Sequence, residues 1–311
     1  MNVRGPGETR GLVAYVSCLE AMGDGRIVDG VDGIDYDMAD LVRASREHRL
    51  DCHVVAWDDD SVDWSRYALC VVRSTWNYFQ DRQRFVDWMT SVDEVSRVAN
   101  NIEILRWNTD KHYLAEVADA RLPVVPTTFI EPASHGWHKH LDHLLASGDV
   151  VVKPAVSAGS NDTERHASAD TARAHIESLL AAGRSVMLQP YLADVDSLGE
   201  TGLVFIDGVY SHAFGKGAIL AAEKNMTGGL YAEEDISARV ASDAELELGR
   251  RAIAWVESRF GTPLYARVDV LPTAHGPVVI ELELTEPSLY LKLGAGAAAT
   301  MAAAVARRLD T

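Results

Sequence analysis

The sequence predicts a mixed α/β protein with more than one domain, and three observations support this. Segments with helical and with strand periodicity alternate along the chain, as they do in proteins whose helices pack on sheets. The 311 residues, of which 47% are hydrophobic, are enough for two or more domains. Two later segments have the pattern of β-hairpins, so we expect α/β organisation first and α+β organisation after it.

The first hundred residues predict an α/β domain, which we place at residues 1–100. Its expected elements follow a β-α-β-β-α order: strand 12–18, helix 35–50, strand 51–57, strand 67–76 and helix 81–92. The strand at 67–76 is nearly all apolar, as parallel strands buried on both faces are. We expect a loose tail at 1–10 and a glycine-rich loop at 23–33.

The remaining chain predicts two α+β units, at residues 101–188 and 189–311. Their expected elements combine helices with hairpins: a helix and then a strand within 108–131, a strand entering a loop at 149–162, a strand at 185–192, a hairpin at 201–216, a helix at 243–260, a hairpin at 265–284 and a helix at 295–309. The first hairpin turns at Asp207-Gly208, a favoured pair for a tight turn.

Charge and composition exclude several classes of function. The net charge of -17 argues against a general nucleic-acid binder and against an anionic membrane surface. No apolar run has membrane-spanning length and no signal peptide is visible. The three cysteines fit no metal spacing, which favours a reducing cytoplasm. Base rates favour a homodimer.

The second hairpin brings charged side chains together. If residues 272–276 form its loop, Arg267 pairs with Glu281 and Asp269 pairs with Val279. Residues two apart on a strand share a face, so these carboxylates, Arg267 and Glu283 lie on one surface. Mg²⁺ would relieve the repulsion between carboxylates, since it prefers hard oxygen ligands. A solvated acidic sheet face is the alternative.

Lys153 lies within an apolar strand, where a lysine is rare unless an anion pairs with it. A phosphate or a carboxylate would serve; the alternative is an edge lysine whose amine reaches water. The small residues at 157–162 let backbone N–H groups approach an anion, although an ordinary turn also explains them. Lys111 reads equally as a helix surface charge. Neither a P-loop nor a G-x-G-x-x-G fingerprint is present here.

Taken in order, six segments resemble the ATP-grasp superfamily, in its glutathione-synthetase-like branch: NTDK, VVVKPAVSAGS, LQPYL, GETGLVFIDGVYSHAFGK, ARVDVL and VIELE. The likeness runs from Asn108 to the C-terminus. It implies an ATP-grasp fold in which two α+β subdomains clasp ATP after an N-terminal α/β domain. The cofactors it implies are ATP and Mg²⁺.

The resemblance also implies roles for individual residues. Asp269, Glu281 and Glu283 match metal ligands, although the family usually has Asn at the last position, which leaves the number of metal ions open. Arg267 matches an arginine that steadies a developing oxyanion, and Lys153 serves both catalysis and ATP binding. The ATP-binding positions are Lys111, Lys153, Ser157, Gly159, Ser160, Gln189, Pro190, Tyr191, Leu192, Glu200 and Lys216, with Glu200 at the ribose.

The family chemistry joins a carboxylate to an amine through an acyl phosphate. Positioning and charge neutralisation supply most of such catalysis, so lysines, Mg²⁺ and an arginine are suitable parts. A small-molecule kinase and a nucleotide-binding module without turnover remain alternatives, the complete lysine and carboxylate set counting against the second. The eleven histidines, including those at 135, 138, 140 and 143, read as surface or loop residues and not as metal ligands, since no zinc-like pattern accompanies them.

The substrate is expected at the end of the strand at 67–76, because ligands bind at the carboxyl ends of strands in open α/β sheets. The candidates to read an amino-acid-like substrate are Arg73, Ser74, Trp76, Tyr78 and Ser288. Packing is the alternative for the aromatic pair. VVRSTWNY together with ELELTEPSLY is similar to cycloserine-synthetase-type ligases (O-ureido-serine cyclo-ligases), which act in antibiotic biosynthesis and close a carboxylate onto an internal amine. An intermolecular amino-acid or dipeptide ligase is the other possibility.

Overall fold

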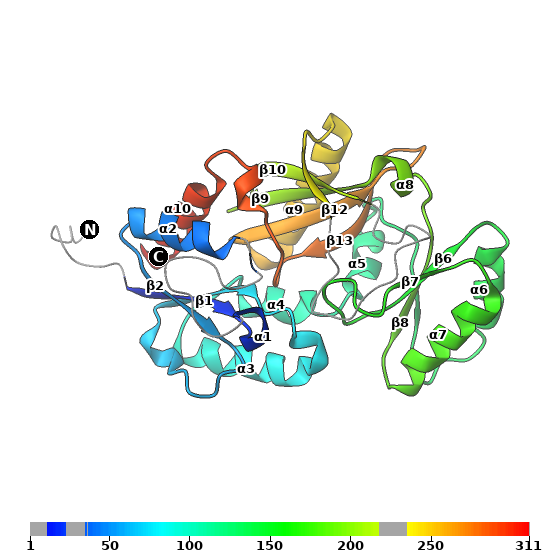
Figure 1. The fold of residues 1–311 in the computed structure, drawn as a ribbon, viewed down its shortest axis with the longest axis horizontal. Coiled ribbons are helices and arrows are strands. Elements are labelled where there is room, and N and C mark those ends of the chain that lie inside the picture. Colours follow the sequence, from blue (N-terminus) through cyan, green and yellow to red (C-terminus); the bar gives the residue numbers. More distant parts are fainter. Residues whose placement is uncertain (1–10, 23–34, 36, 218–234, 311) are drawn as a thin grey trace.

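The computed structural model describes residues 11–22, 35, 37–217 and 235–310 and arranges their strands in three sheets (Figure 1). The tail predicted at 1–10 and the loop predicted at 23–33 lie outside the described residues. The mixed α/β class predicted from the sequence is confirmed. Within the described residues, no helix is both long and apolar enough to cross a membrane.

The N-terminal sheet is parallel, with strand order β2-β1-β3-β4. Its elements are β1 (Leu12–Ser17), α1 (Leu19–Met22), α2 (Met38–Glu47), β2 (Asp51–Ala56), η1 (Trp64–Arg66), β3 (Leu69–Ser74), η2 (Tyr78–Gln80), α3 (Arg82–Val95) and β4 (Val98–Ala99). Every residue of β3 is buried, as its apolar sequence predicted. The two-residue strand β4 was not predicted.

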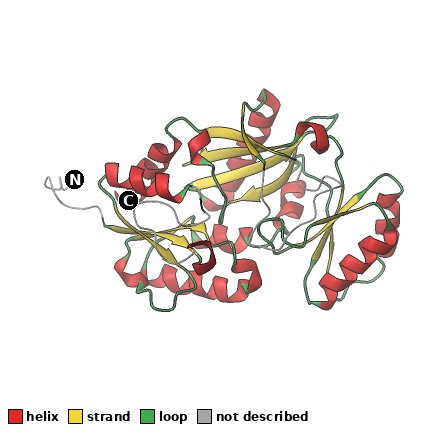
Figure 2. Ribbon diagram, viewed as in Figure 1, coloured by secondary structure: helices red, strands yellow, loops and turns green. Residues whose placement is uncertain are grey.

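The small sheet is antiparallel, with order β5-β8-β6-β7 (Figure 1, right). Its elements are β5 (Thr128–Ile130), α6 (His138–Leu145), β6 (Val150–Pro154), β7 (Glu164–His166), α7 (Ala169–Ala181) and β8 (Val186–Pro190). Helices α6 and α7 cover its outer side (Figure 2). Before it come α4 (Ile102–Asn108) and α5 (Tyr113–Asp119). The sequence predicted one helix from residue 108, whereas Lys111 lies in the break between two.

The central sheet is antiparallel, with order β11-β10-β9-β12-β13. Its elements are α8 (Val195–Leu198), β9 (Glu200–Ile206), β10 (Val209–Lys216), β11 (Ile236–Arg239), α9 (Asp243–Phe260), β12 (Tyr265–Leu271), β13 (Val278–Glu283), η3 (Leu291–Leu293) and α10 (Ala297–Asp310). Asp207 and Gly208 both have positive φ, as a type I′ turn requires. Helix α9 has the predicted bounds and begins at a capping box of Ser242 and Glu245.

The N-terminal and central sheets share one apolar core. Tyr15 and Val71 belong to the same buried cluster as Val204 and Phe214. Polar bonds reinforce this contact: the Asn100 amide donates to the carbonyls of Tyr265 and Leu284, at 2.9 and 2.7 Å. The small sheet instead packs its own cluster against α6 and α7.

The predicted register of the second hairpin is wrong. Arg267 pairs with Glu283 and Asp269 with Glu281, whereas Val270 pairs with Val279. Between these pairs β12 advances by one residue, from 269 to 270, whereas β13 advances by two, from 281 to 279. Ile280 is therefore the extra residue of a β-bulge. A register one residue from the predicted one would have turned Glu281 and Glu283 to the other face of the sheet. The bulge adds a second residue to the shift, so both carboxylates stay on the face of Arg267. The predicted grouping of Arg267 with the three carboxylates on one face therefore holds.

Candidate active site

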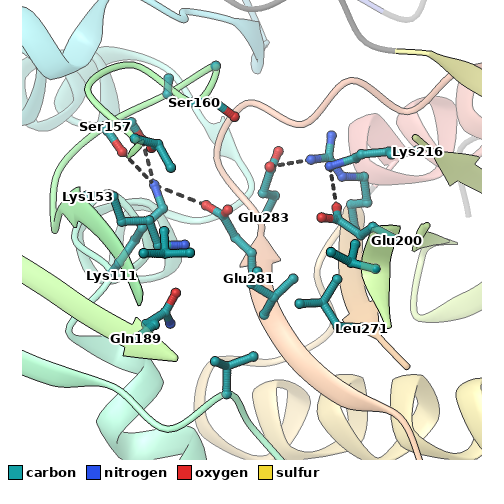
Figure 3. A pocket seen from close by; sticks show the side chains of 18 of the residues that line it. Lys111, Lys153, Ser157, Ser160, Gln189, Glu200, Lys216, Leu271, Glu281 and Glu283 are labelled. Carbon is teal, nitrogen blue, oxygen red and sulfur yellow. Dashed lines mark hydrogen bonds and ion pairs between the residues drawn. The ribbon is translucent and has the colours of Figure 1, made fainter. Parts of the chain in front are cut away.

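A cavity lies between the small sheet and the central sheet (Figure 3). Strands β6 and β8 and the loop that follows β6 form one wall, and the central sheet with residues 286–290 forms the other. Most of the predicted site residues line it: Trp76, Lys111, Lys153, Ser157, Gly159, Ser160, Gln189, Pro190, Tyr191, Leu192, Glu200, Lys216, Arg267, Glu281, Glu283 and Ser288.

Lys111 connects the two walls. Its Nζ atom lies 3.0 Å from Oε1 of Glu281 and donates to the Ser157 carbonyl at 2.6 Å (Figure 3). Its backbone N–H donates to Ala155, which fixes the break between α4 and α5. Burial opposes the charge on Lys111, but Glu281 raises the pKa of the lysine overall. The alternative of a surface charge is thereby excluded.

Lys153 reaches the cavity from β6 and is only 7% exposed. Burial lowers the pKa of its amine. No hydrogen bond or ion pair of its Nζ atom is found within the described ranges, up to residue 217 and from 235 on. A buried ammonium without a partner is costly, so the site favours an anionic ligand beside Lys153.

Asp269 forms the centre of a buried charge network behind the cavity wall. Arg267 donates to both its oxygens, each at 2.8 Å, and Lys216 donates to Oδ2 at 2.8 Å. These cations hold the pKa of Asp269 well below its usual range, although burial opposes them. Arg267 also pairs with Glu283, and Lys216 lies 2.6 Å from Glu200. Of the three predicted metal ligands, Asp269 alone does not line the cavity.

Within the described residues, the cavity lining holds four carboxylates and four cations, so its glutamates already offset its lysines and arginine. Burial and neighbouring carboxylates raise the pKa of Glu283 to about 8 and that of Glu286 to about 7. Burial would raise the pKa of Glu281 too, but Lys111 and Lys153 lower it overall. A polyphosphate would add further negative charge, so a divalent cation between Glu281 and Glu283 would relieve the repulsion. The oxygen donors fit Mg²⁺, with Asp269 available only if its cations move.

The segment after β8 forms the end of the cavity beside Glu200. Gln189 is buried and donates to the Thr127 hydroxyl at 2.8 Å, which anchors the strand end. Tyr191 donates its backbone N–H to Asp149 and stacks under the Arg165 guanidinium. This segment therefore presents backbone and the Leu192 side chain to the cavity rather than a charged group.

Three of the predicted substrate residues lie behind the wall and do not line the cavity. Arg73 is fully buried, donates to the Pro287 carbonyl at 2.9 Å and lies 3.5 Å from Asp37. Ser74 donates to Ser17, and the Tyr78 hydroxyl is hydrogen-bonded to Glu286. The structure thus does not bring Arg73, Ser74 and Tyr78 into the cavity lining; they are buried behind the wall that they support.

Sequence reasoning missed two residues of the opposite wall, Glu286 and Tyr290. Glu286 follows the carboxylate strand directly, in the segment from which only Ser288 was selected. A carboxylate that continues an acidic strand end was a usable signal. Tyr290 has a left-handed φ of 48°, and the Asp37 side chain accepts the backbone N–H groups at 289–291. Nothing local to the sequence indicates that contact.

Comparison with known proteins places the chain among ligases. Residues 13–100 match the family model of the N-terminal domain of D-cycloserine synthetase DcsG. The cycloserine biosynthesis protein DcsG of Streptomyces lavendulae is 38% identical over 288 residues, which cover 89% of this chain and 95% of that protein.

Solved structures agree. The crystal structure of D-cycloserine synthetase DcsG superposes with a TM-score of 0.85 at 36% identity, covering 96% of this chain and all of that one. D-alanine–D-alanine ligase from Bacillus anthracis, complexed with ATP, has a TM-score of 0.68 at 14% identity, covering 96% and 97%. The second likeness shows the fold alone.

The fold and these relatives define an ATP-dependent ligase of the ATP-grasp class, which confirms the superfamily resemblance. Within that class, the chain belongs to the D-cycloserine synthetase family.

Proposed function

We propose that the chain is an intramolecular carboxylate–amine ligase of the cycloserine-forming type. In this reaction ATP phosphorylates the carboxylate of a serine-derived amino acid, and an amine of the same molecule closes the ring. The observation that carries the proposal is the facing arrangement of Lys111 and Lys153 on one wall with Glu281 and Glu283 on the other. Membership of the D-cycloserine synthetase family supports the substrate class. We place the enzyme in the cytoplasm, in keeping with its three free thiols.

The lysines would neutralise the nucleotide phosphates. Lys153, which has no partner in the described part of the cavity, is the stronger candidate, and Lys111 would share its charge between Glu281 and the ligand. Ser157, Gly159 and Ser160 follow β6 and would close over the phosphates with their backbone N–H groups. Gln189 to Leu192 would hold the adenine, and Glu200 with Lys216 the ribose and phosphate oxygens.

Glu281 and Glu283 would hold Mg²⁺, and Asp269 would complete the set if Arg267 and Lys216 release it. The ion would supply positive charge that offsets the charge of the transferred phosphoryl group. Arg267 faces the same space and donates to the Ser288 carbonyl at 3.0 Å. Its guanidinium would steady the oxyanion that forms when the amine attacks.

The amino-acid substrate would lie against the wall made by Trp76, Glu286 and Ser288. Trp76 donates its indole N–H to the Glu286 carbonyl at 2.9 Å, which fixes the aromatic ring beside this segment. Glu286, with a pKa of about 7, is suited to take the proton of an attacking amine. The cavity thus offers a proton acceptor near neutrality on the side of the substrate.

The first experiment is phosphate release with ATP and Mg²⁺ across amino acids given singly and in pairs, including D-isomers and O-substituted serines. Release with one O-substituted serine alone, together with a cyclic product, is the expected result. Release that requires two amino acids would replace the proposal with an intermolecular ligase. A phosphorylated product without released phosphate would replace it with a kinase. Glu281→Gln is expected to abolish turnover, and Glu177→Gln on the exposed face of α7 is the control.

A further inference from the structure

Three potential metal ligands meet on the small sheet, apart from the residues that line the cavity. Glu164 and His166 belong to β7, and His175 belongs to α7, which packs beside it. Their ligand atoms all lie within 4.8 Å of one another. His166 Nε2 is 3.0 Å from His175 Nδ1 and 3.6 Å from Glu164 Oε2, and His175 Nδ1 is 3.8 Å from the same oxygen.

These separations are close to those of a tetrahedral metal site. Zinc bonds of about 2.0–2.1 Å at tetrahedral angles place neighbouring ligand atoms roughly 3.3 Å apart. The observed distances lie on both sides of that value, so small side-chain rotations would bring all three ligands onto one ion. Two imidazoles with a carboxylate are a donor set that suits zinc and related transition metals and that Mg²⁺ disfavours.

A second contact orients the His166 ring. Its Nδ1 atom lies 3.1 Å from the Thr171 hydroxyl, and that hydroxyl in turn donates to the Ser168 carbonyl at 3.2 Å. With its hydrogen directed to that carbonyl, the hydroxyl accepts from His166, whose proton is then on Nδ1. Its Nε2 lone pair then faces His175 and Glu164. Metal-bound histidines usually have such a partner for the second nitrogen, and it fixes the tautomer and the ring direction.

Burial gives the site an inner and an outer side. The side chain of His166 is 5% exposed and that of His175 is 11% exposed, whereas Glu164 is 58% exposed. Two neutral ligands thus lie inside, and the carboxylate closes the site from the surface. Asp162 and Arg184, which pair with each other, are the nearest further charges.

We propose that Glu164, His166 and His175 form a binding site for a divalent transition-metal ion of the zinc type. Glu164 follows Thr163, which lines the cavity at the end of the loop after β6. A bound ion would join β7 to α7 and hold that end of the loop in place. The site is separate from the carboxylates assigned to Mg²⁺, and it stands whether or not the proposed reaction is correct.

Calorimetric titration of the metal-stripped full chain with Zn²⁺, in excess Mg²⁺, tests the proposal. We expect one tight site, and a loss of affinity of about tenfold or more in His175→Gln and in Glu164→Gln. Glu164 is exposed, so Glu164→Gln tests the site even if a change at buried His166 impairs folding. The control is the double variant His140→Gln and His143→Gln on α6, whose exposed histidines are expected to leave the tight site unchanged.

Three results would overturn the proposal. One is the absence of tight Zn²⁺ binding by the parent chain. Another is unchanged affinity in both the His175→Gln and Glu164→Gln variants. The third is loss of binding on Glu281→Gln, or in the α6 double variant, without any loss in the β7 and α7 variants. That last pattern would assign the ion to the cavity carboxylates or to α6.

Discussion

Lys111 and Lys153 are equally buried, at 7% exposure, but only Lys111 has a carboxylate partner within the described parts of the chain. The two amines therefore have different roles in the protein without nucleotide. Lys111 pairs directly with Glu281, whereas Lys153 makes no direct pair in the described residues and interacts with Glu281 only beyond ion-pair distance.

Replacing Lys153 by methionine should separate binding from stability. We expect ATP affinity to fall about tenfold or more, equivalent to about 1.4 kcal/mol per factor of ten. The free energy of unfolding without nucleotide should stay level or rise, because a buried unpaired charge becomes apolar. Calorimetry and urea unfolding measure the two effects, with Lys139→Met on exposed α6 as the control. Unchanged ATP affinity would instead mean that Lys153 does not contact the nucleotide.

Glu286 should make the metal-free protein less stable as pH rises. Its folded-state pKa is about 7, above the ordinary value of 4.5, so the folded state keeps a proton that the unfolded chain loses between these values. The unfolding free energy should fall across that window, by on the order of 1–3 kcal/mol. Urea unfolding from pH 5 to 8 measures the slope.

Glu286→Gln should make this decline shallower up to about pH 7 by removing one of its two sources. The remaining decline belongs to Glu283, whose pKa of about 8 acts in the same direction over the whole range. The exposed Glu177→Gln should keep the parent slope. If Glu286→Gln also keeps it, Glu286 is ionised in the folded protein at neutral pH.

Gly199→Ala should disturb the turn between α8 and β9, which positions Glu200 at the start of β9. Gly199 has φ +69°, and an added Cβ would lie 2.6 Å from the Lys216 carbonyl oxygen. We expect a loss of roughly 2–4 kcal/mol from backbone strain and this contact together. Gly183→Ala is the matched control, since it has φ +75° with nothing within 4 Å of the added atom. Equal losses in denaturant unfolding would mean that the contact with Lys216 contributes nothing.

Asp37→Asn should loosen the wall at residues 288–291. The carboxylate accepts three backbone N–H groups, from Leu289, Tyr290 and Leu291, at 2.7, 3.0 and 2.6 Å. An amide offers one acceptor oxygen, so we expect a loss of about 2–4 kcal/mol of stability. KM for the amino-acid substrate should rise more than KM for ATP. Steady-state kinetics check this against Asp119→Asn on the surface, and an equal rise in both constants would contradict it.

The parts of the fold that were predictable from sequence depend on neighbouring residues. The Asp207-Gly208 turn and the Ser242 capping box need only a few adjacent side chains. The grouping of Glu281 with Glu283 follows from strand periodicity alone. Each of these signals is therefore complete within a short segment.

The parts that were not predictable depend on residues far apart in the chain. The bulge at Ile280 changes the register without any glycine to mark it. Lys111 is buried because its backbone bonds to Ala155 and its side chain pairs with Glu281, two residues that are distant from it in the sequence. Arg73 lies behind the cavity wall, where its Nη2 atom donates to the carbonyl of Pro287, 214 positions away in the sequence. Such contacts exist only after the sheets have packed.

The Tyr265 hydroxyl is hydrogen-bonded to the carbonyls of Val72 and Thr285, and Asn100 bonds beside it. These buried contacts hold the N-terminal sheet and the central sheet together as a single block. The small sheet has its own core, although Met187 of β8 also packs into the apolar cluster of the central sheet, and the chain leading to the small sheet meets the block at the bridge from Val124 to Val279. The described residues thus form one block of two sheets, with the small sheet attached to it. We expect changes in the block to disturb the placement of Arg267 and the carboxylates, and changes in the small sheet to disturb the placement of Lys153, so that the two halves should affect different kinetic steps.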